Sequence, residues 1–276
     1  MTTVLAAHGL GLGPWVFDPW RRPFEAAGYR FEALRMPGHG PEGDASFADA
    51  VAALDAAVGA APGPVVLVAH SYSALVAQVV LCRRTVAAAV LVCPLPPGRP
   101  VPSRASWPHL PRALATLALG RPYRPSRRAW RALGFSHVPD AAFEAAMREA
   151  VPWPPRLCRD LLAAPAVQPT SLDTPVLVVL GGDDPVVPPA AGRVVADLFE
   201  GVAWRYDGVG HTPMLEPGGE RVLADVLAFC AAPVRPRVIE SEGFGPDEGI
   251  GHTTRRARRG EKARKRSAYG QKAARA

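Results

Sequence analysis

A single serine, Ser71, stands between a continuously apolar segment and a segment of helical pattern. The segment Val65–Ala69 is apolar throughout, which is typical of a strand buried on both faces, and Tyr72–Cys82 is predicted as a helix. A serine at such a strand-to-helix turn lies on a strained backbone, with its hydroxyl above the sheet. The N-terminus of the following helix offers free N–H groups and a positive dipole end, which favour developing negative charge. The chemistry predicted for Ser71 is therefore nucleophilic attack.

Two later segments supply the partners that this chemistry needs. A serine hydroxyl is a poor nucleophile at neutral pH without a base. His211 follows the last predicted strand, and Asp183 and Asp184 follow the strand before it. The three kinds of group then lie beyond strand ends at one edge of the sheet, where such folds build their sites. An acid beside the imidazole fixes its tautomer and stabilises its charged form, so the pattern predicts a serine–histidine–acid triad.

Strands and helices alternate on both sides of these residues. The segments predicted as strands are Val4–Ala7, Tyr29–Leu34, Val65–Ala69, Ala87–Cys93, Pro175–Leu180 and Val202–Tyr206. Helices are predicted over Trp15–Ala27, from an N-cap at Ser46 to Val58, over Tyr72–Cys82, and over about 189–199 and 218–230. The alternation predicts an α/β fold with a doubly wound, mostly parallel sheet of about six core strands and helices on both faces.

Residues 94–172 interrupt the alternation. They hold helix candidates near 110–119, 126–133, 140–150 and 156–163, and they show no strand pattern. We therefore expect a helical lid inserted into a core formed by residues 1–93 and 173–231. The insert carries 11 Arg against 4 Asp and Glu, a net charge of +7. These arginines could select an anionic substrate such as an acyl-CoA or a phospholipid, but a solvated face is the favoured interpretation.

Five segments in the same order resemble the α/β-hydrolase superfamily, and within it serine esterases or lysophospholipases with a helical lid. His8-Gly9-Leu10-Gly11 resembles the HG-x oxyanion loop, and Met36–Gly40 resembles the PGHG turn. Val68–Ala74 is similar to the serine elbow, although Ala69 and Ser73 replace both glycines of the G-x-S-x-G pattern. The acid motif is Gly181–Pro188, and the histidine loop is Gly210-His211 followed by Glu216-Pro217. The resemblance covers about residues 3–231, without the two strands that often precede the HG-x strand.

The resemblance implies roles for individual residues. It selects Asp184 over Asp183 as the acid, and it assigns the oxyanion hole to the backbone N–H groups of Leu10 and Tyr72. The implied activity is hydrolysis of a carboxylic ester or thioester through an acyl-enzyme on Ser71, with His211 as the base and no cofactor or metal. The implied partner is a small-molecule ester, thioester or lipid-like substrate.

Other interpretations remain open at this point. Ser71 is also suited to be a helix N-cap, His211 a structural loop histidine and Asp184 a turn residue. The same scaffold serves C–C bond hydrolases, lyases and cofactor-free peroxidases, which only a substrate panel separates. A non-catalytic ligand receptor of this fold would fit the two replaced glycines.

The rest of the chain adds weaker expectations. Residues 232–276 carry 12 Lys and Arg against 5 Asp and Glu, a net of +7, and little apolar content. A solvated, disordered tail is favoured over a segment that binds nucleic acid or an anionic surface. No apolar run is long enough to span a bilayer. The N-terminus has no basic region before its apolar stretch, and the four cysteines include no C-x-x-C pair. We therefore expect a cytoplasmic protein with reduced thiols.

Overall fold

The sheet is the framework on which the candidate residues lie. The computed structural model describes residues 1–40, 43–98, 103–163 and 165–233. These residues contain a six-stranded sheet in the order β2-β1-β3-β4-β5-β6, and every neighbouring pair of strands is parallel. The strands are β1 (Thr3–Ala7), β2 (Arg30–Leu34), β3 (Val65–His70), β4 (Ala88–Val92), β5 (Val176–Gly181) and β6 (Val202–Tyr206). The predicted α/β fold with six parallel strands is confirmed.

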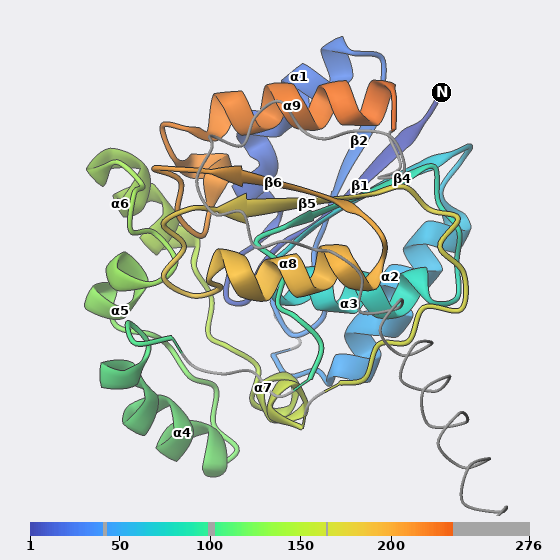
Figure 1. Ribbon diagram of the computed structural model, residues 1–276. Helices are drawn as coiled ribbons and strands as arrows, with labels where there is room; N and C mark the ends of the chain where they lie inside the picture. The colour runs from blue at the N-terminus through green and yellow to red at the C-terminus, as the bar shows by residue number, and fades with distance from the viewer. Residues whose placement is uncertain (41–42, 99–102, 164, 234–276) are drawn as a thin grey trace, which may run out of the picture. The chain divides into compact units, whose positions relative to one another are not determined.

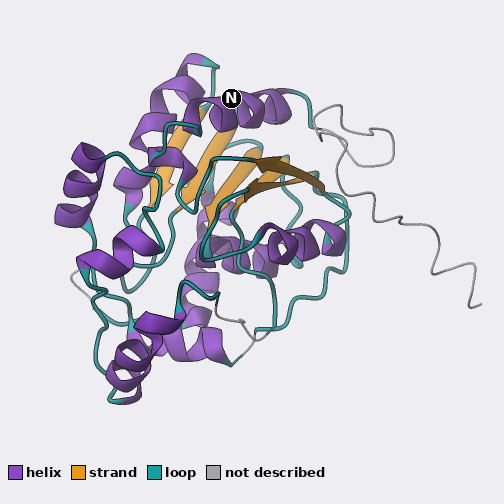
Figure 2. Cartoon of the chain, turned by 60° about the vertical axis from the view of Figure 1, so that its left-hand side comes forward, coloured by secondary structure: helices purple, strands orange, loops and turns teal. Residues whose placement is uncertain are grey.

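Helices cover both faces of this sheet. The core helices are α1 (Asp18–Ala26), α2 (Phe47–Ala60), α3 (Tyr72–Leu81), α8 (Pro189–Leu198) and α9 (Gly219–Ala231). Helices α1 and α9 lie on one face, and α2, α3 and α8 lie on the other (Figures 1 and 2). Strand β3 is continuously apolar because both of its faces are buried under helices. Its Val66 and Val68 pack into the cluster under α1 and α9, whereas Leu67 and Ala69 pack into the cluster under the opposite helices.

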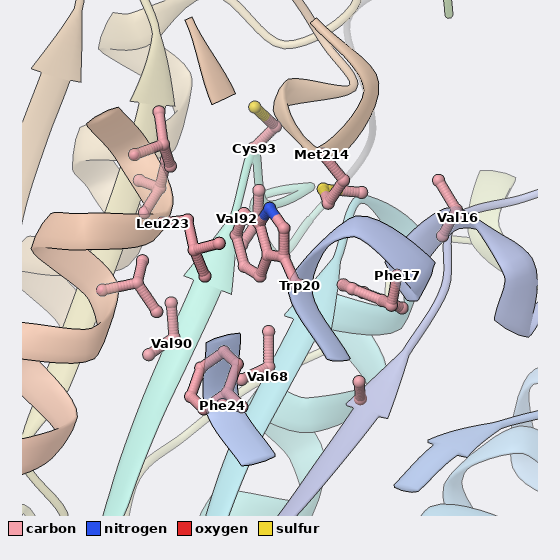
Figure 3. Close-up of a cluster of buried hydrophobic side chains, with 14 of the residues drawn as sticks. Val16, Phe17, Trp20, Phe24, Val68, Val90, Val92, Cys93, Met214 and Leu223 are labelled. Carbon is pink, nitrogen blue, oxygen red and sulfur yellow. The ribbon is translucent and has the colours of Figure 1, made fainter. Parts of the chain in front are cut away.

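The core under α1 and α9 is built around large side chains one helical turn apart. Trp20 and Phe24 of α1 are at most 1 % exposed, and they lie against Val68, Val90 and Leu223 (Figure 3). The spacing of four residues puts both aromatic rings on the same face of the helix. Fully burying an apolar side chain of this kind contributes roughly 1.5–3 kcal/mol each.

Two helix starts follow from local sequence. Ser46 caps α2 through a reciprocal pair of hydrogen bonds: its hydroxyl accepts from the backbone N–H of Asp49 at 3.1 Å, and the Asp49 carboxylate accepts from the Ser46 N–H at 2.8 Å. The single helix predicted over Trp15–Ala27 is wrong in one respect. The segment begins as a 3₁₀ turn, η1 (Pro14–Phe17), before α1 starts at Asp18, because Pro19 has no N–H to continue an α-helical bond to Trp15.

In the described residues, four α-helices lie between β4 and β5. They are α4 (Leu110–Ala118), which follows the short turn η2 (Trp107–His109), α5 (Arg127–Ala132), α6 (Asp140–Glu149) and α7 (Pro155–Leu162). The described part of this insert contains no named strand, but it does contain an antiparallel bridge that the sequence analysis missed. The N–H of Trp153 donates to the carbonyl of Tyr123 at 2.8 Å, and the N–H of Tyr123 donates back at 3.2 Å.

Hydrogen bonds connect the insert to segments of the core. A carboxylate oxygen of Asp160 in α7 accepts from the N–H of Phe47 at the start of α2 (2.8 Å), and Asp44 accepts from the N–H of Arg156 (3.1 Å). The N–H of Val151 donates to the carbonyl of Gly11 at 3.0 Å. In the described ranges, no helix is long and apolar enough to cross a bilayer.

Candidate active site

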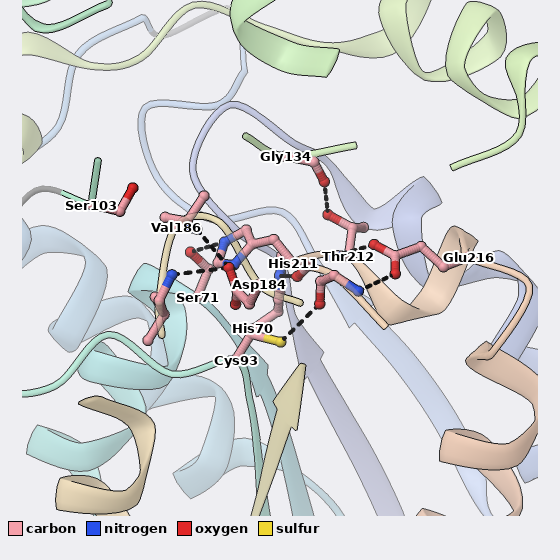
Figure 4. A network of polar contacts seen from close by, with 12 residues as sticks. His70, Ser71, Cys93, Ser103, Gly134, Asp184, Val186, His211, Thr212 and Glu216 are labelled. Atoms are coloured by element: carbon pink, nitrogen blue, oxygen red, sulfur yellow. Dashed lines mark hydrogen bonds and ion pairs between the residues drawn. The ribbon is translucent and has the colours of Figure 1, made fainter. Parts of the chain in front are cut away.

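Ser71 occupies the turn between β3 and α3 in a conformation that few L-residues adopt. Its φ is 58° and its ψ is −121°, so the backbone is strained. Its position is formally the N-cap of α3, yet its side chain makes no cap hydrogen bond. The hydroxyl lies instead 3.0 Å from Nε2 of His211 (Figure 4). The geometry therefore does not support the N-cap interpretation of Ser71.

The two residues that replace the elbow glycines are small for different reasons. Ala69 is fully buried in the cluster between β3 and its neighbours, which leaves no room for a longer side chain. The hydroxyl of Ser73 donates to the carbonyl of His8 at 2.5 Å. This bond ties the elbow to the loop after β1, which carries Leu10. The departure from the G-x-S-x-G pattern thus adds a link between two parts of the site.

His211 is held at both ring nitrogens. Its Nδ1 lies 2.8 Å from Oδ2 of Asp184, and its Nε2 points at Ser71. The histidine is 6 % exposed. With the proton on Nδ1 facing the carboxylate, Nε2 is free to accept a proton from the serine hydroxyl.

Asp184 is fixed by backbone donors on the oxygen that His211 does not use. Oδ1 accepts from the N–H groups of Val186 (2.7 Å) and Val187 (2.9 Å). The adjacent Asp183 points elsewhere: its side chain is 51 % exposed and lies 4.0 Å from His137. The structure thus brings Asp184, and not Asp183, together with Ser71 and His211.

Glycine at position 181 permits the acid loop and the histidine loop to approach. A Cβ at Gly181 would lie 2.2 Å from the carbonyl oxygen of Gly210. No side chain fits at that separation, so the contact between the two loops depends on the glycine.

Glu216 and Thr212 support the histidine loop, although neither was predicted as a site residue. The Glu216 carboxylate accepts from the N–H groups of Gly210 (2.5 Å) and Thr212 (3.0 Å), which flank His211. Burial raises the pKa of Glu216 above 4.5, although these two hydrogen bonds oppose the shift. The Thr212 hydroxyl donates to the carbonyl of Gly134, at the end of α5, at 2.6 Å (Figure 4). Only the Glu-Pro pair of the histidine loop gave a signal in the sequence.

His70 supports the same loop from below. Its Nε2 lies 2.8 Å from the carbonyl of His211, an arrangement in which the ring nitrogen must be the donor. Burial, together with the nearby His211 ring, lowers the pKa of His70 well below 6.5, so the ring is neutral. His8 links the loop after β1 to the loop after β2: its Nε2 accepts from the N–H of Met36 at 3.1 Å, and burial lowers its pKa to about 3.

Cys93 is a buried thiol beside the acid. It follows β4 with a φ of 45°, and its Sγ donates to the carbonyl of Gly210 at 3.6 Å. Burial, with the Asp184 carboxylate nearby, raises the pKa of Cys93 well above 9, so the group remains a thiol. Among the described residues, Cys93, Asp184 and His211 form the one group of three side chains close enough to share a metal ion. Their hydrogen bonds to one another and to the backbone already account for this proximity.

Leu10 lies in the loop after β1 and Tyr72 begins α3 just after β3, and these two strands are adjacent in the sheet. Within the described part of the chain, neither backbone N–H donates to a protein acceptor. The strand order changes direction at these two strands, which is where open α/β sheets bind their ligands.

A cavity of about 380 Å³ opens onto Ser71 and His211. Apolar side chains from the insert form most of its wall, together with Val186, Val187 and Leu10 from the core. Ser103, Ser106 and His109 are polar groups of the wall, and none of the described lining residues is Arg, Lys, Asp or Glu. None of the described arginines of the insert therefore lines this cavity.

A family model and solved structures match this chain. The model described as "Alpha/beta hydrolase family" matches residues 4–224. The chain therefore belongs to the alpha/beta hydrolase family. No curated protein sequence matches significantly.

Solved structures resemble the chain over most of its length. An esterase, RhEst1, from Rhodococcus sp. is 26 % identical, with a TM-score of 0.61 and coverage of 84 % of this chain and 90 % of that one. A putative non-heme bromoperoxidase from Mycobacterium tuberculosis is 25 % identical, with a TM-score of 0.64 and coverage of 83 % and 91 %. A methylesterase from Arabidopsis, at 15 % identity, a TM-score of 0.64 and coverage of 84 % and 99 %, shares the fold.

Proposed function

We propose that this hydrolase cleaves carboxylic esters through an acyl-enzyme on Ser71. The observation that carries the proposal is the continuous chain of contacts from Ser71 through His211 (3.0 Å) to Asp184 (2.8 Å), at the floor of an apolar cavity. The esterase that is 26 % identical to this chain supports the same reaction class. A thioester is an alternative substrate, because the same steps cleave it.

The reaction proceeds in two balanced halves. The Ser71 oxygen attacks the ester carbonyl while His211 Nε2 takes the hydroxyl proton. His211 then gives this proton to the leaving alkoxide, and the acyl group stays on Ser71. Water enters, loses a proton to His211 and attacks the acyl carbonyl, and the proton returns to the Ser71 oxygen as the acid departs. Asp184 holds the imidazole in the required tautomer and stabilises its charged form.

The oxyanion that forms in each half needs hydrogen-bond donors. We assign this role to the N–H groups of Leu10 and Tyr72, which have no protein acceptor in the described residues. Free donors that are already oriented stabilise a developing charge without reorganisation. The bond from Ser73 to the carbonyl of His8 fixes the separation of the two loops that carry these donors.

The cavity wall defines the kind of ester. Trp130, Leu133 and Trp153 offer apolar contact, and the described wall carries no charged side chain that would bind an ionised substrate. A neutral ester with an apolar acyl or alcohol group fits this wall best. We therefore assign residues 94–172 the role of a lid that builds the substrate cavity over the core of residues 1–93 and 173–231.

The four cysteines support a cytoplasmic location as part of this proposal. All four are free thiols, and three of them are buried. Free thiols persist in reducing compartments.

The test is acyl-site labelling with a fluorophosphonate, read by intact-mass spectrometry. We expect one adduct on the wild-type protein and none on Ser71→Ala. Ser103→Ala is the matched control, because Ser103 also lines the cavity but lies away from His211 (Figure 4). This variant should still label. A panel of esters and thioesters of increasing acyl length should then show turnover that Ser71→Ala loses.

A folded wild-type protein that takes no adduct would contradict the proposal and favour a non-catalytic ligand receptor. An adduct that persists in Ser71→Ala would place the nucleophile elsewhere. Turnover of C–C substrates or peroxide in place of the esters would assign the triad to a different reaction.

A further inference from the structure

Helix α4 is apolar around most of its circumference, and only one side of it is covered. Leu110 and Ala113 line the cavity, and Leu117 is 6 % exposed on the same side. The solvent-exposed side of the helix begins at Leu114, which lies one turn after Leu110 and is 47 % exposed, and extends to Leu119 just beyond the helix end, which is 70 % exposed. The other exposed residues of this face are Pro111, Ala115 and Ala118, and Trp107 in the preceding turn is 64 % exposed. Exposed apolar residues gathered on one helix mark an interaction surface.

Arginines surround this face. Arg104 precedes the helix, Arg112 lies on it and Arg121 follows it, and all three are exposed. None of the three forms an ion pair within the described ranges. The sequence contains no Asp or Glu at all from residue 56 to residue 139. The segment that carries this surface therefore combines exposed apolar side chains with arginines and has no acidic side chain of its own.

We propose that this face of α4, with Leu114, Leu119 and the three arginines, docks the protein on an anionic lipid surface. An amphipathic segment binds such a surface by inserting its apolar side chains, while its arginines contact the headgroup phosphates. Figure 1 shows α4 at the outer edge of the insert, away from the sheet.

Charge distinguishes this occupant from two others. The chain's own tail, residues 232–276, has a net charge of +7, so the arginines repel it. A second copy that presented the same face would bring Arg112 against Arg112, and the segment that carries this face has no acidic side chain to oppose them. An anionic lipid surface supplies the opposite charge over the whole face.

The location connects docking with the cavity. The residues on the covered side of α4 form part of the cavity wall, and Leu162 at the end of the neighbouring α7 both lines the cavity and is 45 % exposed. A lipid surface held against α4 therefore lies close to an apolar edge of the cavity. The inference goes beyond the proposed function, because docking requires neither Ser71 nor an ester.

The experiment is co-flotation of the full-length protein with vesicles at physiological salt. The vesicles contain phosphatidylcholine mixed with phosphatidylglycerol, or phosphatidylcholine alone. We expect the wild-type protein to bind the mixed vesicles. The variant Leu114→Ser/Leu119→Ser should bind them with an affinity lower by a factor of roughly 20 or more. The matched control is Leu172→Ser/Val194→Ser. Leu172 and Val194 are also exposed aliphatic residues (37 % and 51 %), and they lie outside α4. This control should bind like the wild type.

A second variant tests the charge. Replacing Arg104, Arg112 and Arg121 by Gln should lower binding to the mixed vesicles by about fivefold for each arginine, and should leave any binding to phosphatidylcholine unchanged. Ser71→Ala should bind like the wild type. Hydrolysis of a soluble short-chain ester should be unchanged in the Leu114/Leu119 variant, because neither residue lines the cavity. Vesicle binding therefore tests the docking inference, and ester hydrolysis tests the proposed function independently.

Three results would overturn the inference. The first is a wild-type protein that does not bind the mixed vesicles. The second is equal binding by the Leu114/Leu119 variant, which would assign the contact to the basic tail or another surface. The third is a concentration-dependent dimer in the absence of vesicles that this variant abolishes, which would identify the face as a contact between two copies.

Discussion

The substitution Asp184→Asn makes the sharpest prediction, because the surroundings fix the orientation of the new amide. The Oδ1 position faces two N–H donors, from Val186 at 2.7 Å and Val187 at 2.9 Å. The asparagine must therefore place its carbonyl oxygen there. Its NH₂ group then occupies the Oδ2 position, 2.8 Å from Nδ1 of His211.

An NH₂ group at that position requires an acceptor. Nδ1 of His211 must then lose its proton, and the neutral ring carries the proton on Nε2, which faces Ser71. A protonated Nε2 cannot accept the hydroxyl proton. In triads of this kind the wrong tautomer lowers kcat by roughly 10⁴-fold, or about 5.5 kcal/mol in activation free energy.

The assay compares kcat and KM of wild type and variants on a chromogenic short-chain ester. We expect Asp184→Asn to lose kcat while its thermal unfolding midpoint stays near that of the wild type, because the shape and two of the hydrogen bonds are kept. The matched control is Asp183→Asn, an exposed neighbour that should stay within about twofold, as surface changes generally do. A loss of less than about tenfold for Asp184→Asn, or a larger loss for Asp183→Asn, would refute the tautomer argument.

Three further predictions concern the supports of the site. Glu216→Gln removes one acceptor from the N–H groups of Gly210 and Thr212, so it should cost about 1–3 kcal/mol in the free energy of unfolding and should lower kcat more than it changes KM. Because the pKa of Glu216 is raised in the folded state, its contribution to the free energy of unfolding is complete below pH 4.5 and is lost as pH rises through the folded pKa. The difference in free energy of unfolding between the wild type and Glu216→Gln, measured by denaturant unfolding, should therefore narrow as pH rises. A difference that widens would contradict the raised pKa of Glu216. Gly181→Ala should lower the free energy of unfolding by about 1–3 kcal/mol and reduce activity, since the methyl group would meet the Gly210 carbonyl. The control is Gly59→Ala in α2, where the methyl group meets only the flexible Arg84 side chain, and this change should not destabilise the fold. In native protein a thiol reagent should titrate Cys82, the one cysteine that is not buried, and denaturation should be needed to reach the other three; rapid native labelling of Cys93 would show that the site opens.

The elements of the fold could be predicted closely from the sequence. The strand predicted over Val202–Tyr206 has those same bounds, and the one predicted over Val65–Ala69 extends by one residue. Each helix predicted in the insert ends within one or two residues of the observed one. Periodicity predicts these elements because each must bury an apolar face, and strands buried on both faces are apolar throughout.

The contacts that support the site could not be predicted in this way. The bond from Ser73 to His8, the bond from His70 to His211, and the position of Cys93 beside Asp184 all join residues far apart in the chain. Ser73 lies in α3 and His70 ends β3, but their partners lie in irregular loops, and loops have no period from which their positions relative to these elements follow. The bridge between Tyr123 and Trp153 was missed for the same reason.

The sequence by itself determined the parallel α/β framework, the residue types of the candidate triad and their order along the chain. It did so because a buried strand that runs into a helix through serine leaves few other solutions. Only the tertiary structure decided that Asp184 faces His211 and that Glu216 holds the histidine loop. It also decided that the described arginines of the insert do not line the cavity, while Leu114 and Leu119 remain exposed. These features depend on how separate loops and helices pack in space, and the spacing of residues along one element does not contain that information.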